Sequence, residues 1–191
     1  MNHCKKAYET TTQMLLRPRE GWNSIKHDST TGEMLSDYIY PMTMLCGTAL
    51  MLGRIISNGT SISTIYSSLT DAAMRSISLL AAYHIATIAV WFITNRLTKG
   101  KIVKETVSVF TGYSMTAILA LEFCVGLFPI LRLPALIAQF YTLKIVGEGA
   151  TTMLNIDKEQ LFTYTTIVSI ILIALPVATS KILSSLTLAL S

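Results

Sequence analysis

The sequence predicts an all-α, polytopic integral membrane protein: a five-transmembrane-helix bundle preceded by a short amphipathic N-terminal segment. Five apolar stretches are each about 20 residues long, the length that a helix needs to cross a hydrocarbon core of about 30 Å. Of the 191 residues, 51% are hydrophobic and 14% are charged, which is far from the usual globular balance. The stretches also lack the alternating polarity of membrane β-strands, so we expect helices.

Residues 1–37 are expected to form the cytoplasmic amphipathic segment. Pro18 divides it, because proline ends one helix and suits the first turn of the next. The first helix should carry one face made of Tyr8, Thr12, Leu15 and Leu16. The second, over 18–27, places Trp22 and Ile25 on one side. Two alternatives stay open: the pair lies in the membrane interface as an anchor, or it packs over the cytoplasmic ends of the spans.

Residues 38–191 are expected to form the transmembrane domain, with spans at approximately 38–57, 72–94, 106–128, 133–152 and 161–184. The short, basic connection 95–104 makes the second and third spans antiparallel neighbours. Pro176 predicts a kink in the fifth span, because proline removes a backbone donor and crowds the preceding turn. Small residues in the first and third spans favour close approach of helices: Gly47, Ala49, Gly53, Gly112 and Ser114.

The placement of basic residues predicts the orientation of the spans. Cytoplasmic loops of membrane proteins are enriched in Lys and Arg. Of the 15 Lys and Arg residues, about eleven lie on the side of the N-terminus and about four on the opposite side. We therefore expect a cytoplasmic N-terminus and, after five crossings, a C-terminus outside.

Ionisable side chains within the spans are costly in lipid and mark function or pairing. Glu122 is the deepest acid, and we expect it to pair with Arg75 or Arg132. His84 lies nearest to mid-membrane and suits an interhelical hydrogen bond, a proton relay or substrate binding. In one hypothesis, His84 and Glu122 line a polar path between helices for a transported solute or lipid.

The sequence contains no pattern typical of catalysis. It lacks HExxH, a nucleophile elbow, a P-loop and an aspartate-rich pair, and Gly147-Glu148-Gly149 follows no strand, so we interpret it as a close-packing site. A lone histidine is no metal ligand set. We expect no enzyme activity, no catalytic, cofactor-binding or metal-binding residue and no cofactor. The expected partners are the lipid bilayer and other membrane proteins in homo- or hetero-oligomers, and no nucleic acid.

Three short motifs resemble those of the Yip domain family. Asp37-Tyr38-Ile39-Tyr40-Pro41, at the start of the first span, resembles its Asp-Leu-Tyr-Gly-Pro motif, and Gly112-Tyr113 is similar to its Gly-Tyr motif. Pro18 and Trp22 match the Leu-x-Pro-x-x-x-Trp-x-x-Ile segment of bacterial members. Two positions depart from the pattern: Tyr40 replaces the motif glycine, and Ala117 stands where many relatives have proline.

This resemblance implies a five-span membrane protein without enzymatic activity, which organises membrane or partner proteins. Asp37 and Pro41 would shape the cytoplasmic start of the first helix, and Gly112 with Tyr113 would set a contact between helices. The chain lacks the long cytoplasmic tail of eukaryotic members, which are linked to Rab GTPases and vesicle traffic. The resemblance therefore implies a compact prokaryotic-type member in a bacterial inner membrane.

Overall fold

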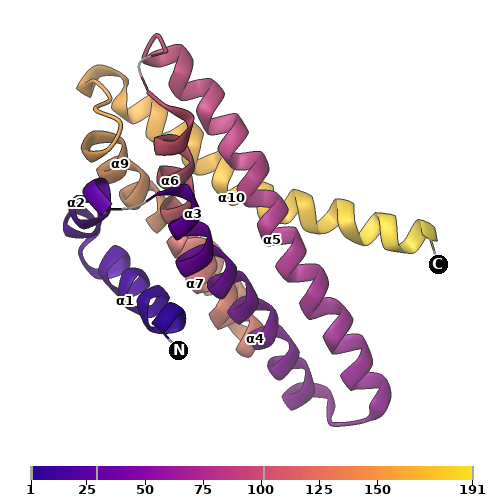
Figure 1. Cartoon of the computed structure of the whole chain (residues 1–191). Coiled ribbons are helices and arrows are strands. Elements are labelled where there is room, and N and C mark those ends of the chain that lie inside the picture. Colours follow the sequence, from indigo (N-terminus) through magenta and orange to yellow (C-terminus); the bar gives the residue numbers. More distant parts are fainter. Residues whose placement is uncertain (1, 29, 101, 191) are drawn as a thin grey trace.

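The computed structural model describes residues 2–28, 30–100 and 102–190, which are almost entirely helical and contain no strand (Figure 1). Five helical stretches of this part of the chain are long and apolar enough to cross a membrane: Thr31–Asn58, Ile62–Leu97, Lys104–Leu127, Pro129–Thr152 and Lys158–Leu186. The predicted class, an all-α polytopic membrane protein, is confirmed.

Helix α1 (Asn2–Leu16) uses a different face from the one predicted. Ala7 and Met14 are fully buried, whereas Tyr8 and Leu16 are 71% and 74% exposed. Ala7 and Met14 are seven residues apart and therefore lie on the same side of a helix. The prediction was wrong because it grouped the largest apolar side chains, while the small Ala7 allows a closer approach to the bundle.

Helix α2 (Pro18–Asp28) begins at the proline that ends α1, as expected, and Pro18 is buried. Figure 1 places α1 and α2 together at one side of the molecule, and α2 lies next to α9 (Thr142–Thr152) and contacts α6 (Lys104–Ser114) through Trp22. The two N-terminal helices are therefore packed against the spans.

The first span is one continuous helical stretch built from α3 (Thr31–Met34), the π-helical turn η1 (Leu35–Ile39) and α4 (Tyr40–Asn58). Thr30 begins it with a capping box, in which its hydroxyl accepts from the Glu33 amide and its own amide donates to the Glu33 carboxylate. In η1, the Tyr40 amide donates to the Leu35 carbonyl, five residues earlier. Pro41 explains this wide turn, because it has no amide to donate and its ring crowds the carbonyl of Asp37.

Helix α5 (Ile62–Leu97) begins at Ile62, whereas the sequence predicted a span from residue 72. Ser61 caps it by accepting from the Thr64 amide, so the polar residues after the turn at Gly59 continue the helix. At 1.5 Å per residue, a helix of 36 residues is about 54 Å long. Figure 1 shows α4 and α5 as an antiparallel pair.

The third and fourth spans are interrupted, which the sequence did not predict. Met115 separates α6 from α7 (Thr116–Leu127), and its amide is shared between the carbonyls of Thr111 and Gly112. The fourth span consists of the 3₁₀ turn η2 (Pro129–Leu131), α8 (Arg132–Ala138), a second 3₁₀ turn η3 (Gln139–Tyr141) and α9. Both spans therefore change direction or pitch inside the apolar stretch.

Helix α10 (Lys158–Leu190) forms the fifth span and contains Pro176 within it. In Figure 1 it crosses α5 and bends where its colour turns from orange to yellow, in agreement with the kink predicted at the proline. Hydroxyls join the two helices: Ser78 donates to Thr179 Oγ1, and Thr179 donates to the Ser78 carbonyl, each at 3.1 Å.

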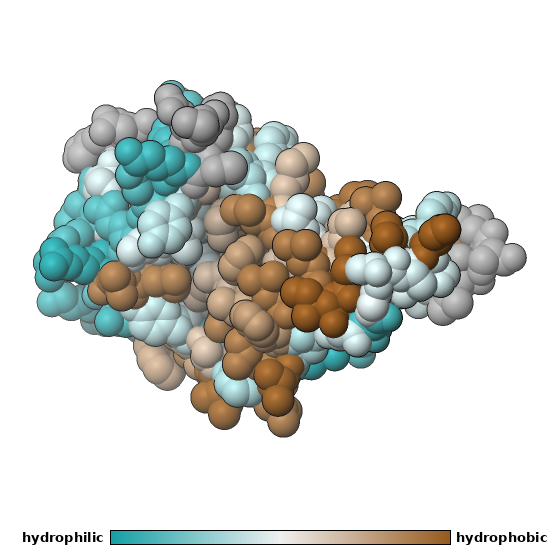
Figure 2. Space-filling view, turned by 90° about the horizontal axis from the view of Figure 1, so that it is seen from below, coloured by the Kyte–Doolittle hydropathy of each residue, from teal (hydrophilic) through white to brown (hydrophobic). Residues whose placement is uncertain are grey.

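Apolar side chains cover much of the outer surface. Figure 2 shows them gathered over the centre of the molecule, with hydrophilic side chains on the side where Figure 1 places α1 and α2. On α5 the exposed apolar side chains include Ile77, Ile85, Ile88 and Phe92. Because lipid is the solvent that such a surface fits, the chain contacts the bilayer through these helices.

Candidate functional site

Trp22 connects α2 to the spans. It is fully buried, its ring stacks on Phe110 of α6 with 5.5 Å between centroids, and its Nε1–H donates to the Ile145 carbonyl of α9 at 2.9 Å. A tryptophan anchored at the headgroup level would instead keep its ring in the interface. Of the two alternatives left open by the sequence, the structure favours packing of the N-terminal helices onto the bundle.

Tyr38 and Tyr113 bring the other two motifs together. Their rings lie 4.9 Å apart, and the edge of Tyr113 also meets the Trp22 ring at 6.4 Å. The Tyr38 hydroxyl donates to Thr116 Oγ1 at 2.7 Å, and that hydroxyl donates to the Tyr113 carbonyl at 2.6 Å. Residues that are far apart in the sequence therefore form one buried aromatic cluster, defined here as Trp22, Tyr38, Phe110 and Tyr113.

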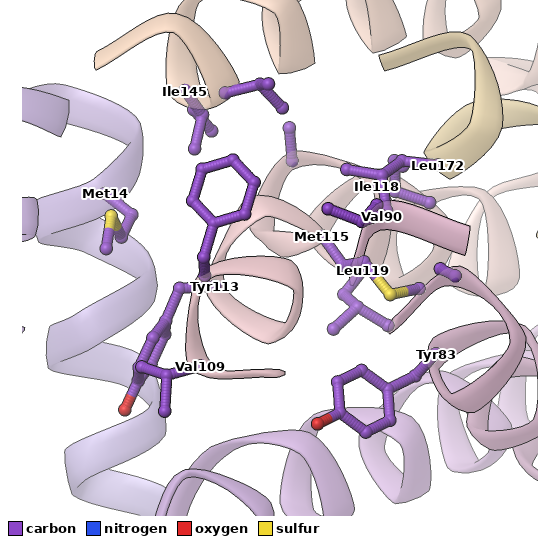
Figure 3. Packing of buried hydrophobic residues seen from close by; sticks show 14 of the residues in the cluster. Met14, Tyr83, Val90, Val109, Tyr113, Met115, Ile118, Leu119, Ile145 and Leu172 are labelled. Atoms are coloured by element: carbon purple, nitrogen blue, oxygen red, sulfur yellow. The ribbon is translucent and has the colours of Figure 1, made fainter. Parts of the chain in front are cut away.

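Figure 3 shows how the third span divides its side chains around this cluster. Tyr113 and Val109 lie on the side of Met14 of α1, whereas Met115 lies toward Tyr83 of α5. The third span therefore contacts the N-terminal helices on one side and α5 on the other.

Glycines make room for two of these contacts. A Cβ on Gly149 would lie 2.5 Å from Cε2 of Trp22, and a Cβ on Gly112 would overlap Sδ of Met34. The Gly147-Glu148-Gly149 stretch is thus a packing site at its second glycine. The neighbour of Gly112 is Met34 of α3, so this close contact between helices lies within one chain.

Asp37 and Pro41 lie at the start of the first span. Lys6 Nζ of α1 donates to Asp37 Oδ2 at 2.6 Å, and this hydrogen bond raises the pKa of the Lys6 ammonium above its ordinary value of 10.5. Pro41 lies in the first turn of α4, directly after the π-helical turn. The motif therefore combines a docking contact for α1 with the wide turn that carries Tyr38.

The intramembrane polar candidates divide into two groups. Arg75 of α5 and Glu122 of α7 form an ion pair, with Nε donating to Oε2 at 3.1 Å and a second contact from Nη2 to Oε1. Arg132, the other partner considered for Glu122, begins α8 and is exposed. His84 is exposed on α5 and packs against the edge of the Tyr83 ring at 5.0 Å.

His84 and Glu122 do not line a common path. The cavity that Glu122 borders is lined from α4, α5, α7, α8 and α10, and His84 is not among its lining residues. The structure therefore gives no geometric basis for the hypothesis of a path that uses both side chains. Among the described residues, no group of three His, Cys, Asp or Glu side chains is arranged to hold a metal ion.

Thr116 and Phe110 are cluster residues that the sequence did not single out. Thr116 follows the Gly-Tyr motif by three residues, a spacing at which its hydroxyl reaches the Tyr113 carbonyl. Phe110 precedes Tyr113 by three residues and so shares its side of the helix. Helical spacing around Tyr113 could have identified both residues. That step requires the third span to be recognised as the centre of the bundle.

Comparison with known families gives one match: the Yip1 domain matches residues 12–179. The matched range contains all three motifs and nearly all of the five spans. No curated protein and no solved structure matches the chain.

Proposed function

The chain belongs to the Yip1 domain family, and we propose that it is a non-enzymatic membrane protein that organises membrane or partner proteins through helix–helix contacts. One observation carries the proposal: the buried aromatic cluster joins three family-like motifs and fixes α1 and α2 against the spans. The aromatic rings, hydroxyls and glycines of this cluster and its surroundings suit helix packing rather than catalysis. The family as a whole is generally non-catalytic.

The surface of α5 supports an assembly. His84 is exposed beside Ile85 and Ile88, which are 47% and 60% exposed. An imidazole that faces hydrocarbon is costly, whereas a neighbouring helix can offer it a hydrogen-bond partner. A homo- or hetero-oligomer packed on this face of α5 would cover the histidine.

The proposed arrangement in the cell follows from the charge distribution. Residues 1–37 form the cytoplasmic part, docked on the cytoplasmic half of the domain formed by residues 38–191, and the C-terminus lies outside. The placement of Trp22 against Phe110 and Gly149 supports docking, since α6 begins and α9 ends on the side richer in basic residues. We place the chain in a bacterial inner membrane, as a compact prokaryotic-type member.

Site-specific photo-cross-linking tests the organising function. A photoreactive amino acid replaces Ile88 on the exposed face of α5, and as a control it replaces Phe162, which is 81% exposed on α10. In cell membranes and in liposomes at a low protein-to-lipid ratio, we expect protein adducts at residue 88 and few at residue 162.

Two results would contradict the organising function. Equal yields at both positions would indicate random collisions between proteins in the membrane. Adducts with lipid alone, in cells and in liposomes, would show that this face of α5 has no protein neighbour.

A further inference from the structure

A polar cavity of about 240 Å³ lies at the end of the bundle where α4 leads into α5, on the far side from the aromatic cluster. Five helices contribute to it, which makes it a built feature of the bundle. Its polar lining includes Arg54, Asp71, Arg75, Glu122, Arg132 and Ser180. Ligand pockets for drug-sized molecules measure roughly 300–1,000 Å³, so this cavity is the size of a small polar group.

The charged side chains of the cavity do not balance. Arg54 pairs with Asp71 between α4 and α5, and Arg75 pairs with Glu122 between α5 and α7. Both carboxylates of the lining are thus engaged by an arginine. Arg132 of α8 supplies a third guanidinium, and no ion pair joins it to another of the described residues. The lining therefore carries a surplus positive charge.

We propose that the cavity binds the phosphate group of a lipid headgroup, with Arg132 as the main contact. The guanidinium is a planar fork of donors that matches phosphate oxygens in pairs. The two ion pairs hold the adjacent helices together and keep the other two guanidinium groups next to the site. This inference does not depend on the organising function.

Exposed apolar side chains close in sequence to the lining residues favour a lipid as the source of the phosphate. Ile130 and Leu133, on either side of Arg132, are 87% and 75% exposed. Leu186 of α10, one turn after the lining residue Leu183, is 53% exposed. A soluble anion would gain nothing from these side chains, whereas a phospholipid can place its phosphate in the cavity and its acyl chains along them.

Binding measurements on the full chain in detergent test the proposal. The probes are a short-chain phosphatidylglycerol, the matching diacylglycerol without phosphate, and inorganic phosphate. Arg132→Gln removes the charge, and Arg96→Gln is the control, because Arg96 is also exposed but lies near the other end of α5, over the Phe92 ring.

Phosphatidylglycerol should bind the unmodified chain at least about tenfold more tightly than diacylglycerol, because a lost hydrogen bond to a charged group weakens binding by that order. Arg132→Gln should lose a similar factor, Arg132→Lys should keep part of the affinity, and Arg96→Gln should keep all of it. Unfolding temperatures of the variants check that each remains folded.

Equal binding of phosphatidylglycerol and diacylglycerol would overturn the proposal without any variant. Unchanged affinity in folded Arg132→Gln would overturn the role of Arg132. Inorganic phosphate that binds as tightly as phosphatidylglycerol would show a site for the free anion and overturn the lipid assignment.

Discussion

At the scale of the residue, Trp22 and Gly149 show how a short motif specifies one contact. The indole fills the space that a side chain at residue 149 would need, and its Nε1–H donates to the Ile145 carbonyl one helical turn away. A tryptophan side chain contributes a large buried apolar area, and the hydrogen bond of its N–H fixes the orientation of the ring. A purely apolar side chain at this position could bury area but could not donate a hydrogen bond to that carbonyl.

We expect Trp22→Ala to destabilise the fold by about 3–5 kcal/mol, because it leaves a cavity and removes the indole hydrogen bond. Trp22→Phe should cost less, since it keeps much of the stacking on Phe110. The control is Tyr8→Ala, which changes an aromatic residue that is 71% exposed on α1. Thermal unfolding in detergent measures the three variants. Equal unfolding temperatures for Trp22→Ala and Tyr8→Ala would show that the indole does not anchor α2.

The Tyr38–Thr116 hydrogen bond makes a second prediction at this scale. Thr116→Val should cost about 1–3 kcal/mol, because it leaves the buried Tyr38 hydroxyl without its acceptor. Adding Tyr38→Phe to Thr116→Val should cost little more, since both polar partners are then gone. A double-mutant cycle on the free energy of unfolding measures this coupling. Strictly additive effects would mean that the two side chains do not interact.

At the scale of the element, the motifs coincide with departures from regular helix. The π-helical turn η1 precedes Pro41, and the break at Met115 follows Gly112 and Tyr113. Irregular helical turns often mark functional positions, because they redirect side chains that a regular helix would point elsewhere. Here the wide turn contains the buried Tyr38, and the break at Met115 lies between Tyr113 and Thr116, which both contact Tyr38.

The docking of α1 depends on pH through Lys6. Because the pKa of Lys6 is raised in the folded chain, its bond to Asp37 stabilises docking fully below about pH 10.5 and is lost as the pH rises through the folded-state value. Lys6 is 59% exposed, so the effect should be well under about 1 kcal/mol. Lys6→Gln should lower the unfolding temperature slightly at pH 8, and this difference should vanish once the pH has risen through the raised pKa of Lys6.

Lys5→Gln is the matched control for the pH experiment. Lys5 lies next to Lys6 and is 78% exposed, and its ion pair among the described residues is with Glu9, one turn along the same helix, at 3.8 Å. Its replacement should leave the docking of α1 to the first span unchanged at every pH. A difference between Lys6→Gln and the unmodified chain that persists at high pH would assign the effect to packing of the lysine stem instead of its charge.

At the scale of the whole molecule, the sequence is most informative where lipid imposes the constraint. Long apolar runs predict five spans because unsatisfied backbone groups are too costly in hydrocarbon. The Arg75–Glu122 pair also follows from depth, since both side chains lie toward the same ends of their helices. The start of α5 at Ile62 could not be predicted in this way. The Ser61 cap and the polar first turns of the helix look like a loop when hydropathy alone is considered.

Tertiary packing explains the remaining differences. The buried face of α1 is set by Ala7, whose small size matters only once a partner helix is known. Similarly, the exposure of His84 depends on which side of α5 meets α4 and α10. The sequence indicated that these residues lie in helices, but their environment is decided by residues far along the chain.

The orientation of the whole bundle is the remaining prediction. In a background with Cys4 and Cys124 replaced by serine, single cysteines are placed at Thr60, in the α4–α5 turn, and at Lys99, after α5; Cys46 stays because it is buried. Because basic residues concentrate on the side of Lys99, an impermeant thiol reagent applied to intact cells should label Thr60→Cys and spare Lys99→Cys. Both should react after permeabilisation. Labelling of Lys99→Cys alone in intact cells would invert the proposed topology, and labelling of both would show that α5 does not cross the membrane.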